Sequence, residues 1–205
     1  NDLGYDGSTI TGVTVVARNP GSWGNGLKVA IIDDLADQVL TFSSLPANIA
    51  VGYGITQNVP ANTVLAGSGT TSLLTGFFKG IVTEVDSANN KVSVKVLEQV
   101  NSAGVSTEVS YQPNGLYKFG NTAVAIHTTG VGAAYTTGNV PTGNVDWFDS
   151  QTIQLTNSTI NWNNVADRPG TSSFAEARNS RFDEVHVVVI DDLGEVTGNA
   201  GTILE

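Results

Sequence analysis

Two pairs of neighbouring aspartates are the residues of this chain best suited to chemistry. Asp33 and Asp34 end one apolar run, and Asp191 and Asp192 end a second. Carboxylates gathered from adjacent strand ends would suit a divalent cation, which prefers oxygen ligands. Consecutive strand residues point to opposite faces, however, so each pair offers only one inward carboxylate. Aspartates in turns after strands are far commoner than metal sites, and we therefore expect no metal here.

Histidine and serine offer no stronger site. His127 and His186 are the only histidines, and neither has a second histidine three or four residues away, as a zinc pair would need. His186 lies inside an apolar run, where we expect a neutral, packed ring with a hydrogen-bonded nitrogen. A Gly-x-Ser-x-Gly turn, which would favour a serine nucleophile, does not occur in the sequence. We therefore predict no catalytic, cofactor-binding or metal-binding residue, no cofactor and no enzymatic activity.

The tryptophans could act as a sugar-stacking platform, but anchoring of a core or an interface is the commoner role. Trp23 lies in a glycine-rich turn cluster at 19–26, and we expect it to be buried under these turns. Trp147 and Trp162 bracket a segment with strand character at 151–160, and we expect both to be packing anchors.

Two apolar runs must position most of these residues. Residues 27–33 read Leu-Lys-Val-Ala-Ile-Ile-Asp, and residues 185–191 read Val-His-Val-Val-Val-Ile-Asp. Blocks so rich in β-branched residues are typical of strands covered on both faces. The similarity of the two runs predicts neighbouring central strands of one sheet. The long segment between them is then an excursion from a common base.

That excursion is predicted to be antiparallel and rich in β-structure. Strands at 77–85 and 91–97 flank a turn at 86–90, and valines alternate with Lys91, Ser93 and Lys95, which predicts a hairpin with one dry and one wet face. Further strands are predicted at 10–17 and 105–111, with one more at 151–160 that has room for a bulge. The sequence also predicts a strand or helical turn at 36–42, a loop at 60–72 and a surface loop with some strand character at 120–144. A helix is predicted to begin with a capping box at Ser173 and to end at Asn179.

These elements predict a mainly β fold, of the α+β kind with few short helices. A base sheet or sandwich domain would contain residues 1–35 and 160–205. Residues 36–159 would form an inserted antiparallel β-rich lobe, either a barrel or a sandwich. A chain of 205 residues is long enough to bury a sizeable core in this arrangement.

Composition excludes several partners. The chain has 19 acidic and 9 basic residues and a formal net charge of −10, and its basic residues are scattered, so we expect no nucleic-acid binding. The absence of cysteine excludes disulfides and thiolate metal sites. No long apolar run suggests membrane insertion. The chain starts without methionine or a secretory signal, which favours an internal fragment of a longer protein.

Four segments carry a family resemblance. Residues 17–33, with Asn-Pro-Gly-Ser-Trp-Gly-Asn at 19–25, resemble a segment of contractile bacteriophage tail sheath proteins of the T-even-like and cyanophage-like branch. Residues 168–175, 183–192 and 198–205 resemble later segments of the same proteins, in the same order. The resemblance implies a structural virion protein of the phage tail, assembled in the host bacterial cytoplasm. Sheath subunits form stacked rings around a tail tube and contract to drive it through the host envelope.

Two classes of function remain open. The first is the outer part of a sheath subunit, whose partners would be other copies of the subunit, with the tail tube contacted by parts outside this fragment. The second is an acidic β-sandwich module that binds a glycan or a protein in adhesion. The resemblance favours the first class. We expect the isolated chain to be a monomer in dilute solution, because its net charge makes copies repel one another.

Overall fold

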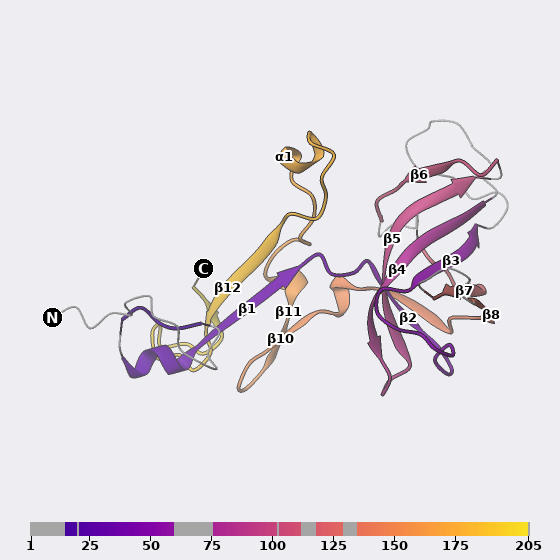
Figure 1. Cartoon of the computed structure of the whole chain (residues 1–205). Helices are drawn as coiled ribbons and strands as arrows, with labels where there is room; N and C mark the ends of the chain where they lie inside the picture. The colour runs from indigo at the N-terminus through magenta and orange to yellow at the C-terminus, as the bar shows by residue number, and fades with distance from the viewer. Residues whose placement is uncertain are drawn as a thin grey trace. The chain divides into compact units, whose positions relative to one another are not determined.

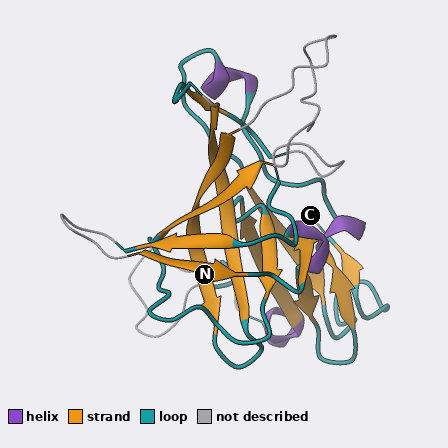
Figure 2. Ribbon diagram, turned by 90° about the vertical axis from the view of Figure 1, so that its right-hand side faces the viewer, coloured by secondary structure: helices purple, strands orange, loops and turns teal. Residues whose placement is uncertain are grey.

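The computed structural model describes residues 15–19, 21–59, 76–101, 103–111, 118–128 and 135–204. The fold is mainly β, and its helices are short (Figure 2). The chain divides into two compact units: the described residues up to 34 together with those from 151 form the first unit, and residues 35–150 contribute the second. The sequence predicts divisions after residues 35 and 159, and the second observed boundary lies earlier than that.

The first unit is built on a three-stranded antiparallel sheet. Its strands are β1 (Leu27–Asp33), β12 (Val185–Asp191) and β13 (Thr202–Ile203), in the order β1-β12-β13. β1 and β12 pair along their whole length, from Leu27 opposite Asp191 to Asp33 opposite Val185 (Figure 1). The prediction that the two apolar runs are neighbours in one sheet is confirmed. β12 is the middle strand, whereas β1 lies at the edge of the described sheet.

The two faces of this sheet are covered to different extents, because the second face is partly buried only at the Asp191 end, where Val29 and Val189 are half-buried. Ile190, Val188 and Ile32, which lie on one face, are between 0% and 6% exposed. On the other face, Ile31 and its cross-strand partner Val187 are 56% and 54% exposed. The prediction that these strands are covered on both faces is therefore wrong at the end that carries Ile31, Val185 and Val187. β-branched residues favour a strand through their restricted side chains, whether or not both faces are buried.

A hairpin replaces the single strand predicted at 151–160. It consists of β10 (Thr152–Gln154) and β11 (Thr159–Asn161), which pair antiparallel. The chain reverses because the Leu155 amide donates to the Ser158 carbonyl at 2.8 Å, and the Thr159 hydroxyl donates to the Gln154 side chain at 2.9 Å. Trp162 begins a 3-10 helix, η3 (Trp162–Asn164), directly after the hairpin.

The predicted helix exists but starts with a different cap. In α1 (Ser173–Glu176) the N-cap is Ser172, whose hydroxyl accepts a hydrogen bond from the Ala175 amide. Ser172 has extended backbone angles, as an N-cap residue requires, so the capping box predicted to start at Ser173 is wrong. The helix ends at Glu176 with Ala177 as its C-cap, earlier than the predicted end at Asn179, which follows in a turn with a φ of 54°.

The second unit contains one eight-stranded antiparallel sheet. Its strands run in the order β8-β7-β3-β4-β5-β2-β9, and β6 adds to β5. The short connection at 140–142 joins β8 to β9 although they stand at opposite ends of this order, so the sheet curls to bring its two edges together. The bounds are β2 Gln38–Thr41, β3 Gly54–Val59, β4 Gly76–Asp86, β5 Lys91–Asn101, β6 Ser106–Glu108, β7 Val124–His127, β8 Tyr135–Asn139, β9 Gly143–Asp146 and a 3-10 helix η2 Phe148–Ser150.

The curled sheet encloses a core around Phe119. This side chain is fully buried and meets Phe78 edge to face, with 6.5 Å between ring centroids. Gly80 of β4 makes this packing possible, because a Cβ there would lie 2.9 Å from the Phe119 ring and 2.5 Å from the Lys95 carbonyl oxygen. Leu40 and Ile55, from β2 and β3, belong to the same cluster.

The predicted hairpin is confirmed as β4 and β5, but of the residues predicted on its solvent-exposed face only Lys91 is exposed. Ser93 and Lys95 are only 5% and 7% exposed. β5 has a neighbour on each side, β4 along one edge and β2 or β6 along parts of the other. The Ser93 hydroxyl also donates to the Glu84 carboxylate across the strands at 3.1 Å. Side chains of the adjacent strands, and not water, therefore surround Ser93 and Lys95.

Other predictions have mixed outcomes. The segment 36–42 contains a strand, β2, and the strand predicted at 105–111 is the shorter β6. The segment 120–144, predicted to be mainly surface loop, contributes β7, β8 and β9, because residues such as Val124 and Ile126 bury fully in the sheet. Residues 15–17 are not part of a strand, while 10–14 lie outside the described residues, as does the loop predicted at 60–72.

Candidate functional site

The two aspartate pairs do not form one site. Antiparallel pairing of β1 with β12 places Asp33 opposite Val185 and Asp191 opposite Leu27, at opposite ends of the two strands. Across the part of the chain that the structure describes, no three histidine or carboxylate side chains gather as metal ligands would. The sequence showed that both runs end in aspartates, but it did not show the direction of pairing, which decides their separation.

Asp191 instead organises the loop that follows β12. Its side chain is fully buried, and Oδ2 accepts hydrogen bonds from the Val196 amide, the Thr197 amide and the Thr197 hydroxyl at 2.7–3.0 Å. Burial opposes the charged form, but the hydrogen bonds from Thr197, Val196 and Glu195 outweigh burial and hold the pKa of Asp191 below its usual 3.8. The carboxylate is thus a structural acceptor that closes a turn.

Asp192 joins the β10–β11 hairpin to the end of β12. Its Oδ1 accepts the Thr156 amide at 2.9 Å, and its Oδ2 accepts the Thr156 hydroxyl at 2.8 Å. Both carboxylate oxygens therefore bind groups of the chain itself. This arrangement gives the second aspartate pair a structural explanation that needs no ligand.

The histidines lie in different units and have different surroundings. In the second unit, His127 Nε2 lies 2.8 Å from the Thr56 hydroxyl, on the neighbouring strand β3. His186 of β12 is half-buried, and its Nδ1 has no hydrogen-bond partner among the described residues. The expected hydrogen bond to a His186 nitrogen is therefore not found at Nδ1.

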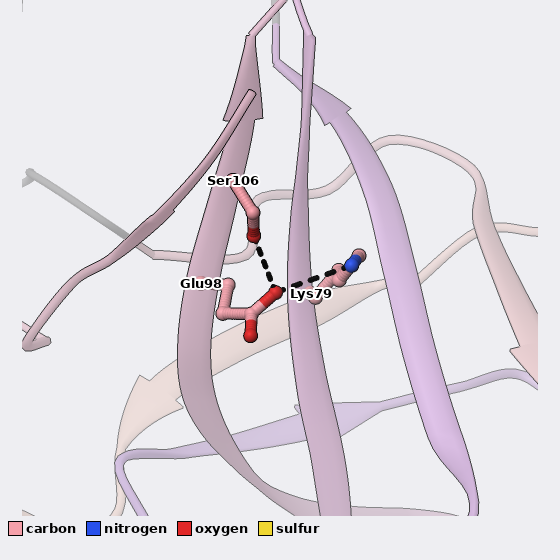
Figure 3. A network of polar contacts seen from close by, with 3 residues as sticks. All are labelled: Lys79, Glu98 and Ser106. Carbon is pink, nitrogen blue, oxygen red and sulfur yellow. Dashed lines mark hydrogen bonds and ion pairs between the residues drawn. The ribbon is translucent and has the colours of Figure 1, made fainter. Parts of the chain in front are cut away.

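One polar cluster on the second unit ties β6 to the hairpin β4–β5. Glu98 Oε2 accepts from the Ser106 hydroxyl at 2.6 Å and pairs with the Lys79 ammonium at 3.1 Å (Figure 3). The Ser106 hydrogen bond first, and Lys79 second, lower the pKa of Glu98 below its usual 4.5. Both charged side chains are more than two-fifths exposed, so the cluster lies open to water and resembles a surface contact between strands.

Trp23 lies at the surface, contrary to the prediction that it is buried. Its side chain is 38% exposed, and it rests against Gly21, where a Cβ would lie 2.3 Å from the indole Nε1. The ring forms one wall of an open hollow of about 410 Å³, a size within the range of small-molecule pockets. Val16, Val29 and Val189 are among the other walls. Trp147 and Trp162, each 4% exposed, are the buried anchors that the sequence predicts.

The apolar surface continues beyond this hollow along β1 and β12. Leu27 and Val29 line the hollow, and they follow one another with Ile31 at every second position of β1, so the three side chains lie on the same face of the sheet. On β12, Val185 and Val187 lie opposite Asp33 and Ile31 and are 56% and 54% exposed. An exposed apolar face of this kind is typical of an interaction surface. The sequence pattern marked these residues as apolar but could not show that they are uncovered.

No helix within the described residues is long and apolar enough to span a bilayer. Among the described residues, the Asp191 and Asp192 carboxylates accept hydrogen bonds from groups of the chain itself, and Ile31, Val185 and Val187 form an exposed apolar surface. Comparisons of the chain with models of known protein families, with curated proteins and with solved structures find no match.

Proposed function

We propose that this chain is the outer part of a contractile phage tail sheath subunit, a structural protein without catalytic activity. The resemblance of residues 17–33, 168–175, 183–192 and 198–205 to sheath segments motivates the proposal. The subunits would surround the tail tube in the virion and contract to drive it through the host envelope. Contact with the tube would come from parts outside this chain.

The observation that carries the proposal is the uncovered apolar face of β1 and β12. Ile31, Val185 and Val187 would be stabilised by burial against another protein surface, since each buried apolar side chain contributes about 1.5–3 kcal/mol. A protein whose work is assembly needs such a face, and a protein that works alone does not. The resemblance to sheath segments makes other copies of the subunit the partners in this proposal.

The second unit fits the role of an outer lobe. It closes its own core around Phe119 and begins and ends within residues 35–150. An insertion that is stable in itself adds bulk to a subunit without taking part in the base sheet. We place it on the outside of the tube, away from the tail tube.

A second candidate is an adhesion module that binds a glycan or a protein. The exposure of Trp23 favours it, because an indole beside an open hollow of about 410 Å³ offers a flat apolar surface to a sugar ring or a partner side chain. Titration with a glycan library, followed by tryptophan fluorescence, tests this candidate. Saturable quenching that Trp23→Ala removes, with Trp147 and Trp162 retained, would favour binding over assembly.

The sheath proposal is tested by expressing the complete reading frame that encodes this chain and examining the product by negative-stain electron microscopy. Hollow tubes or stacked rings are the expected result. A product that remains monomeric at every concentration and salt condition would contradict the proposal.

A further inference from the structure

The loop between the β10–β11 hairpin and β12 presents an unusual set of side chains. It carries α1 beyond the start of β12 (Figure 1). Phe174 is 65% exposed and Phe182 is 36% exposed, although both are large apolar residues. We call Phe174, Arg178, Arg181 and Phe182 the aromatic tip.

Each ring of the aromatic tip lies under a guanidinium group. The Arg178 Cζ is 3.6 Å from the Phe174 ring centroid, and the Arg181 Cζ is 4.9 Å from that of Phe182. Arg178 also donates to the Phe174 carbonyl at 3.1 Å. A guanidinium has five N–H donors in one plane, so Arg178 can stack on a ring and donate to the Phe174 carbonyl while it keeps further donors for a carboxylate.

Hydrogen bonds hold the base of the aromatic tip together. Asp183 accepts both the amide and the hydroxyl of Ser172, at 2.8 and 2.6 Å. The Phe182 amide donates to the Thr171 hydroxyl at 3.0 Å, and the Gly170 amide donates to Glu184 at 2.8 Å. The exposed rings are therefore displayed on a fixed support, which lowers the entropy lost on binding.

Phe182 is held in a strained backbone conformation. Its φ of 60° lies in the left-handed region, which bulky residues rarely adopt. Such strain persists only where the surroundings enforce it, and it concentrates at binding and functional sites. Here the strained residue presents a ring that is 36% exposed and stacks with Arg181.

The exposed end of the sheet has the complementary chemistry. Ile31, Val185 and Val187 are 54–56% exposed, and the exposed Asp33 lies directly opposite Val185 on the same face. We call Ile31, Asp33, Val185 and Val187 the acceptor face. It combines apolar side chains with a carboxylate, as the aromatic tip combines rings with guanidinium groups. The tip of the same copy does not cover it, since these side chains are exposed.

We propose that the aromatic tip of one copy docks on the acceptor face of a second copy. The Phe174 and Phe182 rings would pack on Ile31, Val185 and Val187, and the Arg178 guanidinium would bind the Asp33 carboxylate. Local charge complementarity favours a second copy as the partner, because the tip supplies arginine and the acceptor face supplies the Asp33 carboxylate, a pairing that offsets part of the repulsion from the net charge of −10. This inference deepens the proposed function by naming the surfaces through which copies meet.

The contact is small, and its affinity should be low. A stable interface buries about 800 Å² on each partner, far more than two rings and three aliphatic side chains provide. The isolated chain is therefore a monomer in dilute solution, and the contact forms at high concentration or when assembly holds copies together.

A charge swap tests the proposal. Sedimentation equilibrium of the whole chain up to about 1 mM, at physiological salt, should detect weak self-association. Arg178→Glu and Asp33→Lys should each lower the association constant about tenfold or more, and the double variant should recover most of this loss. Lys91→Glu and Asp149→Lys are matched controls, since they make the same charge changes at exposed positions of the second unit.

A variant without a charge change gives an independent measurement. Phe174→Ser should weaken association, and Val51→Ser, which removes another exposed apolar side chain, should not. Circular dichroism confirms that each variant is folded. The proposal is overturned if the wild type stays monomeric at about 1 mM, if tip variants behave like their controls, or if the double variant shows no recovery. Tubes formed by the complete protein with Arg178→Glu would overturn the tip contact and leave the sheath proposal intact.

Discussion

The side-chain amide of Gln38 forms two hydrogen bonds with the backbone of Phe119, 81 residues later in the chain. Nε2 donates to the Phe119 carbonyl at 3.0 Å, and Oε1 accepts the Phe119 amide at 2.7 Å. Gln38 is 1% exposed, so both bonds lie in the core. Gln57 binds the next residue, Gly120, in the same two-sided manner. Two glutamines thus fix the segment that carries the central aromatic residue of the second unit.

Replacing Gln38 with leucine should destabilise the second unit by about 2–5 kcal/mol, because the amide and the carbonyl of Phe119 would both stay buried without a partner. Gln99→Leu is the matched control. Gln99 is 4% exposed, and its Nε2 has no hydrogen-bond partner among the described residues, so its loss should be nearly neutral. Urea denaturation followed by circular dichroism measures both. Equal losses for the two variants would show that the Phe119 contacts contribute nothing specific.

The fold was predictable where local pattern decides it. The pairing of 27–33 with 185–191 and the hairpin across 86–90 follow from apolar runs and turn residues. In that turn Asp86 accepts the Ala88 and Asn89 amides, and Asn90 adopts a φ of 53°.

The remaining errors concern what covers each residue. Lys95 is buried although its alternation with valines predicts a wet face, and Trp23 is exposed although its glycine turns predict burial. The burial of Lys95 and the exposure of Trp23 both depend on contacts with elements far away in sequence, and the periodicity of a local segment carries no information about such contacts. The candidate interaction surface was missed for the same reason, since a valine run looks alike whether one face or both are covered.

Asp191 should make stability fall in acid. The pKa of Asp191 in the folded chain lies below 3.8, so the unfolded chain binds this proton first as the pH falls. The stability that Asp191 contributes is therefore present above its unfolded-state pKa and is lost as the pH falls through its folded-state pKa. Asp191→Asn should lower stability at neutral pH and flatten the decline below about pH 4. Urea denaturation across that range measures the slope, with exposed Asp33→Asn as a control for net charge. An unchanged acid slope in Asp191→Asn would contradict the assignment.

The three tryptophans should differ in their contributions to stability. Trp162→Ala and Trp147→Ala each leave a cavity at a buried site, so we expect losses of about 3–5 kcal/mol. Trp23→Ala should lower the free energy of unfolding by about 1–2 kcal/mol, because folding removes less of the apolar surface of Trp23 from contact with water. The denaturation midpoints of the three variants show which substitution costs the most stability and which the least. A loss for Trp23→Ala as large as that for Trp162→Ala would mean that Trp23 is buried after all.

The ion pair between Lys79 and Glu98 should contribute little. Its side chains are 43% and 41% exposed, and pairs of this kind are worth about 0.2–1 kcal/mol. Lys79→Gln should therefore shift stability by less than about 1 kcal/mol, and the shift should shrink further at high salt. Thermal denaturation at low and high salt measures it. A large, salt-independent loss would indicate that the cluster in Figure 3 supports more than β6.

The most direct test of the sheath proposal is the radial position of residues 35–150 in an electron cryomicroscopy map of tubes formed by the complete protein. The proposal predicts that density for this unit lies at the outer radius of the tube, clear of the central channel, with copies meeting through residues 27–33 and 170–191. Density for the same unit lining the channel, or a map in which β1 and β12 face only solvent, would contradict it.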